Sequence, residues 1–111
     1  MNGWIAVDLD GTLAEYHGWK GVEHIGEPVP AMVARVRTWL AEGKEVRIFT
    51  ARVAEPDTSK RIVVVRHIEE WCVKHVGPLL RITNVKDYGM IELWDDRCIQ
   101  VRINTGVPVG Q

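Results

Sequence analysis

WIAVDLDGT, residues 4–12, joins an apolar run to two carboxylates and a turn. Side chains on a strand alternate between its two faces, so Asp8 and Asp10 point the same way if the strand extends through them. Two like charges 4 Å apart repel by roughly 4 kcal/mol at an effective dielectric constant of 20. A fold keeps such a pair where a cation or a proton shares the site. Because open α/β sheets place their ligands at the carboxyl ends of strands, this stretch predicts an active site at the edge of an α/β sheet.

The rest of the chain alternates strand and helix patterns around this first strand. We expect strands at residues 4–9, 45–49, 79–82, 90–94 and 98–103, helices from Pro30 to Gly43 and from Asp57 or Thr58 to about His75, and an irregular loop at residues 11–28. Strands that alternate with helices predict a parallel sheet with right-handed crossovers. We therefore expect an α/β fold, a Rossmann-like three-layer sandwich with a mostly parallel five-stranded sheet and no cap domain, in one domain spanning residues 1–111.

The composition indicates an ordinary globular domain and gives no charge-based argument for several classes of partner. The chain has 111 residues, a hydrophobic share of 46% and a net charge of −1, which gives no electrostatic reason to bind nucleic acid or a membrane surface. Cys72 and Cys98 do not have the spacing of metal ligands, and we expect reduced thiols in a cytoplasmic protein. The sequence shows neither a signal peptide nor a segment apolar and long enough to span a bilayer.

Polar side chains follow three of the expected strands, where each strand ends. These residues are Asp8 and Asp10 after the first strand, Thr50 after the second, and Asp95 and Asp96 after the fourth, with Lys86 in the loop before the fourth. The carboxyl ends of parallel strands share one edge of the sheet, so these groups can meet although they are far apart in sequence. Mg²⁺ prefers oxygen ligands and is held by one or two carboxylates together with substrate phosphate. The pattern therefore predicts a magnesium site for a phosphorylated substrate.

Four segments of the chain resemble the motifs of the haloacid dehalogenase superfamily, the hydrolases that use an aspartate nucleophile. DLDGTL at residues 8–13 matches the first motif, IFTAR at residues 48–52 resembles the second, Lys86 matches the third, and ELWDDR at residues 92–97 resembles the acidic fourth. The short gap between the third and fourth motifs is similar to that of the 5′(3′)-deoxyribonucleotidase-like branch. The resemblance extends from Trp4 to about Ile103.

The resemblance implies a phosphatase mechanism and a metal site. Asp8 is expected to attack phosphorus and form an aspartyl-phosphate. Asp10 is expected to protonate the leaving oxygen and then to activate water. The implied Mg²⁺ ligands are the Asp8 side chain, the backbone carbonyl of Asp10, and a carboxylate of Asp95 or Asp96.

The resemblance also implies how the phosphate is held. Thr50 and the backbone amides of Leu9 and Ala51 are expected to hydrogen-bond the phosphoryl oxygens. Lys86 is expected to neutralise charge on the phosphate and on Asp8. An aspartate at position 10 is typical of phosphatases and phosphomutases rather than dehalogenases or transport ATPases.

The chain lacks room for the cap domain that large relatives insert between these motifs. We expect an open site, unless Tyr16, His17 and Trp19 fold over it or a homo-oligomer covers it. An open site admits phosphate on a polymer end or on a protein, and equally a weakly bound small ester. Nucleotide specificity does not transfer, because the deoxyribonucleotidase relatives carry a cap.

Several alternatives stand beside this interpretation. The chain could be a phosphate- or metal-binding module with negligible turnover, or a phosphatase of nucleic-acid 3′ ends, although the near-neutral charge argues against strong polymer binding. Arg52 and Arg97 are expected to brace the acidic groups through ion pairs rather than to bind substrate, although either could do both. His17 and His24 have no third ligand nearby and are expected at the surface rather than on zinc.

Overall fold

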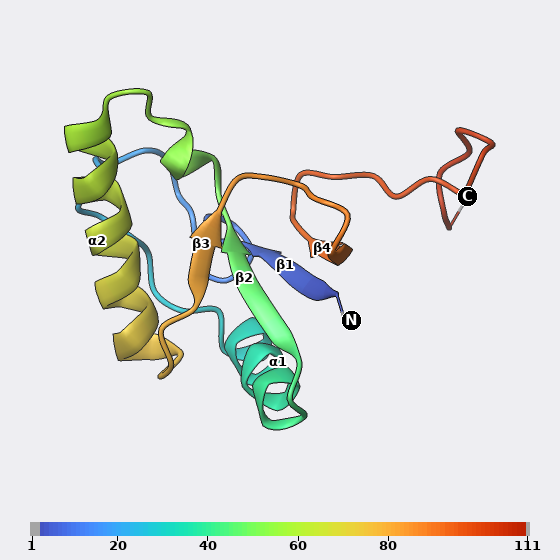
Figure 1. The fold of residues 1–111 in the computed structure, drawn as a ribbon, viewed down its shortest axis with the longest axis horizontal. Coiled ribbons are helices and arrows are strands. Elements are labelled where there is room, and N and C mark those ends of the chain that lie inside the picture. The colour runs from blue at the N-terminus through green and yellow to red at the C-terminus, as the bar shows by residue number, and fades with distance from the viewer. Residues whose placement is uncertain (1–2, 111) are drawn as a thin grey trace.

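The computed structural model describes residues 3–110, and its elements follow the expected alternation of strands and helices (Figure 1). In chain order these are β1 (Trp4–Asp8), α1 (Pro30–Ala41), β2 (Glu45–Phe49), the 3₁₀ helix η1 (Ala51–Ala54), α2 (Thr58–His75), β3 (Arg81–Thr83) and β4 (Met90–Trp94). The segment between β1 and α1 is irregular, as predicted. Within residues 3–110, no helix is both long enough and apolar enough to cross a membrane.

The strands form one parallel sheet in the order β3-β2-β1-β4. Asp8 at the end of β1 pairs in register with Phe49 at the end of β2, and Val7 pairs with Trp94 at the end of β4. All four strands therefore deliver the residues that follow them to one edge. The prediction of an α/β fold with a parallel sheet is confirmed.

Local sequence signals set the helix ends close to their predicted positions. Pro30 occupies the first turn of α1, where its missing N–H is not needed. Gly43 follows α1 with a φ of +80°, and its N–H donates to the carbonyl of Leu40 at 3.0 Å. The Asp57 side chain caps α2 by accepting a hydrogen bond from the backbone N–H of Lys60 at 2.9 Å.

Both helices pack on the same face of the sheet, so the expected three-layer sandwich is wrong for the part of the chain described. Buried residues of α1 and α2 share one hydrophobic core with Ile5, Val7 and Ile48. Arg37 of α1 donates hydrogen bonds to the carbonyls of His75 and Val76 at the end of α2. The strand order explains this arrangement, because two successive right-handed crossovers in the same direction place both helices on one face.

The opposite face of the sheet is covered by side chains and a loop rather than by a helix. Trp4 is only 1% exposed there, and the Arg47 guanidinium lies 4.3 Å from its ring centroid. The indole N–H of Trp4 donates to Asp87 at 2.8 Å, and its backbone N–H donates to the carbonyl of Gly89. These contacts fix the loop between β3 and β4.

The sheet has four strands rather than five, because residues 98–103 do not join it. After β4 the chain runs away from the sheet toward the C-terminus (Figure 1). It forms its own turn, in which Arg102 donates to the carbonyl of Val107 and Val109 donates to that of Gln100. Asn104, with a φ of +64°, permits this turn. The residues whose alternating apolar pattern predicted a fifth strand thus make a local antiparallel contact within the C-terminal segment.

Smaller differences concern β3 and the thiols. β3 begins at Arg81 rather than at Leu79, which is 56% exposed and precedes the paired residues. Cys72 and Cys98 are both free, as expected for reduced thiols.

Candidate functional site

Three carboxylates meet at the edge of the sheet where β1 and β4 end. One oxygen from each of Asp8, Asp95 and Asp96 lies within 4.8 Å of the others. Asp8 closes β1, while Asp95 and Asp96 directly follow β4, which pairs with β1. Parallel pairing therefore brings together groups more than eighty positions apart in sequence.

Burial and the neighbouring carboxylates both disfavour the ionised form of Asp8. Burial contributes most, followed by the negative charge of Asp95 and by the hydrogen bond and charge of Asp96, and together they raise the pKa of Asp8 from its ordinary value of 3.8 to about 7. A group held in this way binds a proton near neutral pH unless a cation replaces it. The described carboxylates thus lie close together at the strand ends, and Asp8 is the one whose ionised form is disfavoured.

Thr12 links two of the carboxylates and was not assigned a role from the sequence. Its hydroxyl lies 3.4 Å from Oδ2 of Asp8 and 3.2 Å from Oδ1 of Asp96, and it accepts a hydrogen bond from the backbone N–H of Asp96 at 3.0 Å. The hydroxyl positions the Asp96 backbone and carboxylate against the turn that follows β1. Its place in the DLDGTL stretch is the only sequence signal for this role.

Asp10 lies apart from the three clustered carboxylates and pairs with Arg52. Nε of Arg52 donates to Oδ2 of Asp10 at 2.7 Å, and Nη2 donates to Oδ1 at 2.9 Å. This bidentate geometry is the strong form of an Arg–carboxylate pair. The bracing role expected for Arg52 is confirmed, whereas Arg97 contacts Asp95 only through its backbone N–H.

Arg52 also holds the loop that borders the pocket. Its Nη2 donates to the carbonyl of His24 at 2.9 Å and its Nη1 to that of Val22 at 3.4 Å. The guanidinium carbon lies 4.9 Å from the ring centroid of Trp19, a cation–π contact. One side chain therefore connects Asp10 to the loop that follows the first motif.

An open pocket of about 790 Å³ contains most of the predicted groups. Asp8, Asp10, Asp95 and Asp96 line it together with Thr50 and Ala51. Tyr16 and Trp19 also line it, as expected for residues that fold over the site, whereas His17 does not.

Thr50 is placed to donate a hydrogen bond into this pocket. Its backbone N–H is used in the sheet, and its hydroxyl oxygen accepts from the backbone N–H of Arg52 at 3.1 Å as the cap of η1. Because this contact uses a lone pair, the hydroxyl hydrogen remains available. The side chain of Leu9 is fully buried in the core, so only its backbone can serve a ligand.

Lys86 is exposed and does not line the pocket. The contacts of Asp87 and Gly89 with Trp4 hold its loop against the helix-free face of the sheet. Asn84 and Arg97 line the pocket instead; the sequence predicted no role for Asn84 and mainly a bracing role for Arg97. The position of Asn84 directly after β3 is the same strand-end signal that identified Thr50.

Comparison with known proteins identifies the fold but no family. No protein-family model matches the chain, and no curated protein matches it. A solved structure described as a conserved protein from Bacteroides thetaiotaomicron is similar, with a TM-score of 0.63 and 22% sequence identity over 88% of this chain and 78% of that one. At this identity, the structural similarity supports the α/β architecture and does not indicate a function.

Proposed function

We propose that the protein is a magnesium-dependent phosphomonoester hydrolase of the capless haloacid dehalogenase type, acting through an aspartyl-phosphate. The observation that carries the proposal is the cluster of Asp8, Asp95 and Asp96 in an open pocket that also contains Asp10 and Thr50. Metal-binding carboxylates, a nucleophile, a second aspartate and a hydroxyl donor are the groups that this reaction needs.

The residues present fit a Mg²⁺ ion. The side chains of Asp8 and of Asp95 or Asp96, with the backbone carbonyl of Asp10, offer the hard oxygen ligands that this ion prefers. Burial and the neighbouring carboxylates raise the pKa of Asp8 to about 7, and a bound cation would favour its ionised form. When bound, the cation neutralises charge on the phosphate and makes the phosphorus more electrophilic.

In the first step an oxygen of Asp8 forms a bond to phosphorus while the bond from phosphorus to the leaving oxygen breaks. Asp10 gives its proton to that leaving oxygen. In the second step Asp10 takes a proton from water, the water oxygen bonds to phosphorus, and the Asp8–phosphorus bond breaks. Inorganic phosphate leaves, and both aspartates return to their starting states.

The remaining groups position the phosphoryl oxygens. The Thr50 hydroxyl and the backbone amides of Leu9 and Ala51 donate to them, as an oxyanion hole does. Arg97 lines the pocket and is placed to neutralise charge there. Lys86 can share this role only if its loop turns toward the pocket.

Hydrolysis of p-nitrophenyl phosphate tests the proposal directly. We expect release of p-nitrophenol that requires millimolar Mg²⁺ and is abolished by EDTA. A panel of nucleotides, sugar phosphates and alkyl phosphates distinguishes an unsuitable substrate from an inactive protein. Absence of metal-dependent turnover on the whole panel contradicts the proposal.

Gly11 provides a test of the metal site alone. It has a φ of +91°, and a Cβ at this position would lie 2.5 Å from Oδ2 of Asp96. Gly11→Ala is therefore expected to displace that carboxylate and weaken Mg²⁺ binding by about 10-fold, the lower end for disturbed metal ligation, measured by calorimetric titration. Gly77→Ala is the matched control, because Gly77 has a φ of +115° with open space around it. Equal loss of Mg²⁺ affinity in the two variants contradicts the assignment of Asp96.

One observation favours a second candidate function, a binding module with negligible turnover. Both carboxylate oxygens of Asp10 accept hydrogen bonds from Arg52, so each already has a partner other than a leaving group. The two candidates differ in one measurement, because a binding module retains Mg²⁺ and phosphate in equilibrium dialysis but hydrolyses no ester on the panel.

A further inference from the structure

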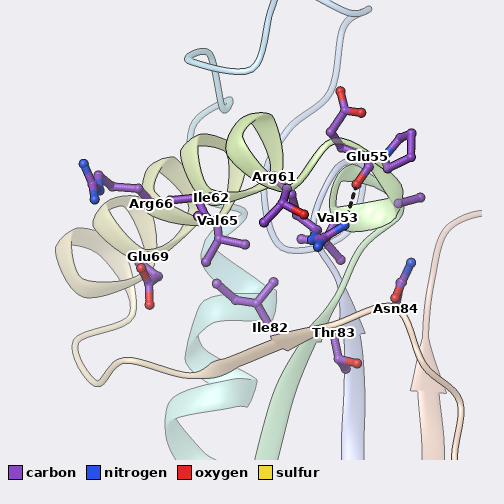
Figure 2. A pocket seen from close by; sticks show the side chains of 13 residues that line it. Val53, Glu55, Arg61, Ile62, Val65, Arg66, Glu69, Ile82, Thr83 and Asn84 are labelled. Atoms are coloured by element: carbon purple, nitrogen blue, oxygen red, sulfur yellow. Dashed lines mark hydrogen bonds between the residues drawn. The ribbon is translucent and has the colours of Figure 1, made fainter.

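A second cavity of about 670 Å³ lies between α2, η1 and β3 (Figure 2). Val53, Ile62, Val65 and Ile82 give it an apolar lining. Figure 2 shows Val65 of α2 and Ile82 of β3 extending toward each other across the groove. The catalytic proposal uses none of these four side chains.

The groove adjoins the acidic pocket. Ala54 at the end of η1 and Asn84 after β3 line both cavities. Neither cavity is covered by a cap within residues 3–110, so a ligand can extend from one into the other. With the phosphate of a substrate in the acidic pocket, the part of the substrate next to the phosphate can lie in the groove.

One wall of the groove is the open edge of a β-sheet. β3 is the last strand of the sheet and pairs only with β2. The carbonyl of Thr83 accepts a hydrogen bond from the N–H of Thr50, so the backbone groups of Thr83 face β2. Because successive residues of a parallel strand alternate in this respect, the N–H and carbonyl of Ile82 face outward. An extended peptide can pair with these two groups.

The length of the groove matches a short extended peptide. Its α2 wall runs from Thr58 to Glu69, which is roughly 16 Å at 1.5 Å per helical residue. This length accommodates about five residues of extended chain at 3.3 Å each. A small metabolite would occupy only part of it.

The charged groups at the groove also suit a polypeptide. Arg61, Arg66, Glu55 and Glu69 line it, so both signs of charge are present. Arg61 is anchored by a hydrogen bond from Nη1 to the carbonyl of Glu55 at 2.9 Å. An apolar floor with mixed charges complements apolar side chains at alternate positions of a peptide, rather than a second anionic group.

We propose that the groove between α2 and β3 binds an extended polypeptide segment by strand addition to β3, and that this segment carries the phosphorylated side chain presented to Asp8. Only one part of this inference, that the bound segment presents a phosphate for hydrolysis, rests on the proposed phosphatase function. The other part, that the groove binds an extended peptide, depends on the groove and on the edge of β3. Peptide binding can be measured without turnover.

The test compares peptides of alternating valine and threonine with phosphoserine at the first or the last position. We expect the better peptide to exceed free O-phosphoserine in kcat/KM by at least about 10-fold, chiefly through KM, since the groove buries apolar side chains that free O-phosphoserine lacks. Two further peptides carry N-methyl groups at either the odd or the even backbone nitrogens. One of these two sets is expected to remove the gain in kcat/KM over O-phosphoserine, and the other is expected to keep it. Only pairing of the peptide backbone with β3 produces that dependence on register.

Two neighbouring residues of α2 provide a matched pair of variants. Ile62 is 55% exposed and lines the groove, whereas Val63 is 47% exposed and does not. Ile62→Glu is expected to lower kcat/KM for the phosphopeptide by at least about 10-fold and to leave hydrolysis of p-nitrophenyl phosphate unchanged. Val63→Glu is expected to leave both within about two-fold, as for a solvent-facing substitution.

The outcomes separate the two proposals. If p-nitrophenyl phosphate is hydrolysed but the peptides have no advantage over O-phosphoserine, or if the two glutamate variants behave alike, the inference is wrong and the phosphatase proposal stands. If nothing is hydrolysed, anisotropy of a fluorescein-labelled phosphopeptide decides whether the groove binds a peptide. Binding that Ile62→Glu weakens and Val63→Glu does not supports the groove, whereas no binding overturns it.

Discussion

Replacing Asp8 by asparagine is expected to lower kcat/KM for p-nitrophenyl phosphate by at least about 10³-fold, because removal of a nucleophile has effects of this size or larger in other hydrolases. The amide keeps the size of the carboxylate but cannot form the proposed aspartyl-phosphate, and it removes one charged ligand of the proposed metal site. Steady-state hydrolysis at saturating Mg²⁺ measures the loss. Acid quenching of the wild type during turnover, followed by peptide mass analysis, is expected to show one phosphoryl group on the peptide containing Asp8.

The control for this experiment is Glu70→Gln on the exposed surface of α2, which removes one negative charge away from the pocket. It is expected to retain wild-type activity. Circular dichroism confirms that both variants are folded. Retention of more than a tenth of wild-type activity by Asp8→Asn contradicts the covalent mechanism, whatever the substrate.

The second large effect concerns stability, which is expected to depend on pH and Mg²⁺ through Asp8. Its pKa is about 7 in the folded protein and near 3.8 in the unfolded chain. Between these values the folded state retains a proton that the unfolded state has lost. The contribution of Asp8 to the free energy of unfolding is therefore fully present below about pH 4 and is lost as the pH rises through about 7.

Mg²⁺ is expected to reverse this loss, since the proposed site would bind it through the ionised carboxylates of the folded state. At a concentration 100 times its Kd, a ligand adds about 2.7 kcal/mol to the free energy of unfolding. For a domain of this length this corresponds to an increase in Tm of about 10 °C. Thermal unfolding in EDTA and in Mg²⁺ from pH 4 to pH 8 measures both effects.

Asp8→Asn is the decisive comparison for stability. It is expected to unfold at a higher temperature than metal-free wild type at pH 8, to lose the decline from pH 4 to 7, and to respond less to Mg²⁺. Glu70→Gln is expected to follow the wild type in all three respects. A wild-type Tm that is unaffected by Mg²⁺ at pH 8 excludes a cation site at these carboxylates.

Sequence patterns predicted the parallel sheet and most of the pocket because the signals involved are local. The end of β1 at Asp8 and the start of α2 after Asp57 depend on strand periodicity and on a capping side chain, which a sequence displays directly. Convergence of Asp8 with Asp95 and Asp96 then follows from the geometry of parallel strands. No knowledge of side-chain packing is needed for this step.

Features that depend on competition between distant contacts could not be predicted in this way. Residues 98–103 have a strand pattern, but the turn around Asn104 satisfies them locally and leaves β4 at the edge of the sheet. Lys86 has the expected position in the sequence, yet the hydrogen bond of Trp4 to Asp87 holds its loop at the helix-free face. The single helical layer follows from the strand order, which the strand patterns alone do not specify.

The bidentate pair between Asp10 and Arg52 has a consequence for how the pocket responds to charge. The guanidinium that binds Asp10 also holds the carbonyls of Val22 and His24 and contacts the ring of Trp19. These contacts use four of its five N–H groups, so an anion that takes two N–H groups of Arg52 must displace at least one of them. By thermodynamic reciprocity, an anion that draws Arg52 away loosens the loop by the same free energy that the loop subtracts from binding of the anion. The stability of the loop that Arg52 holds and the affinity of the pocket for an anion are therefore coupled.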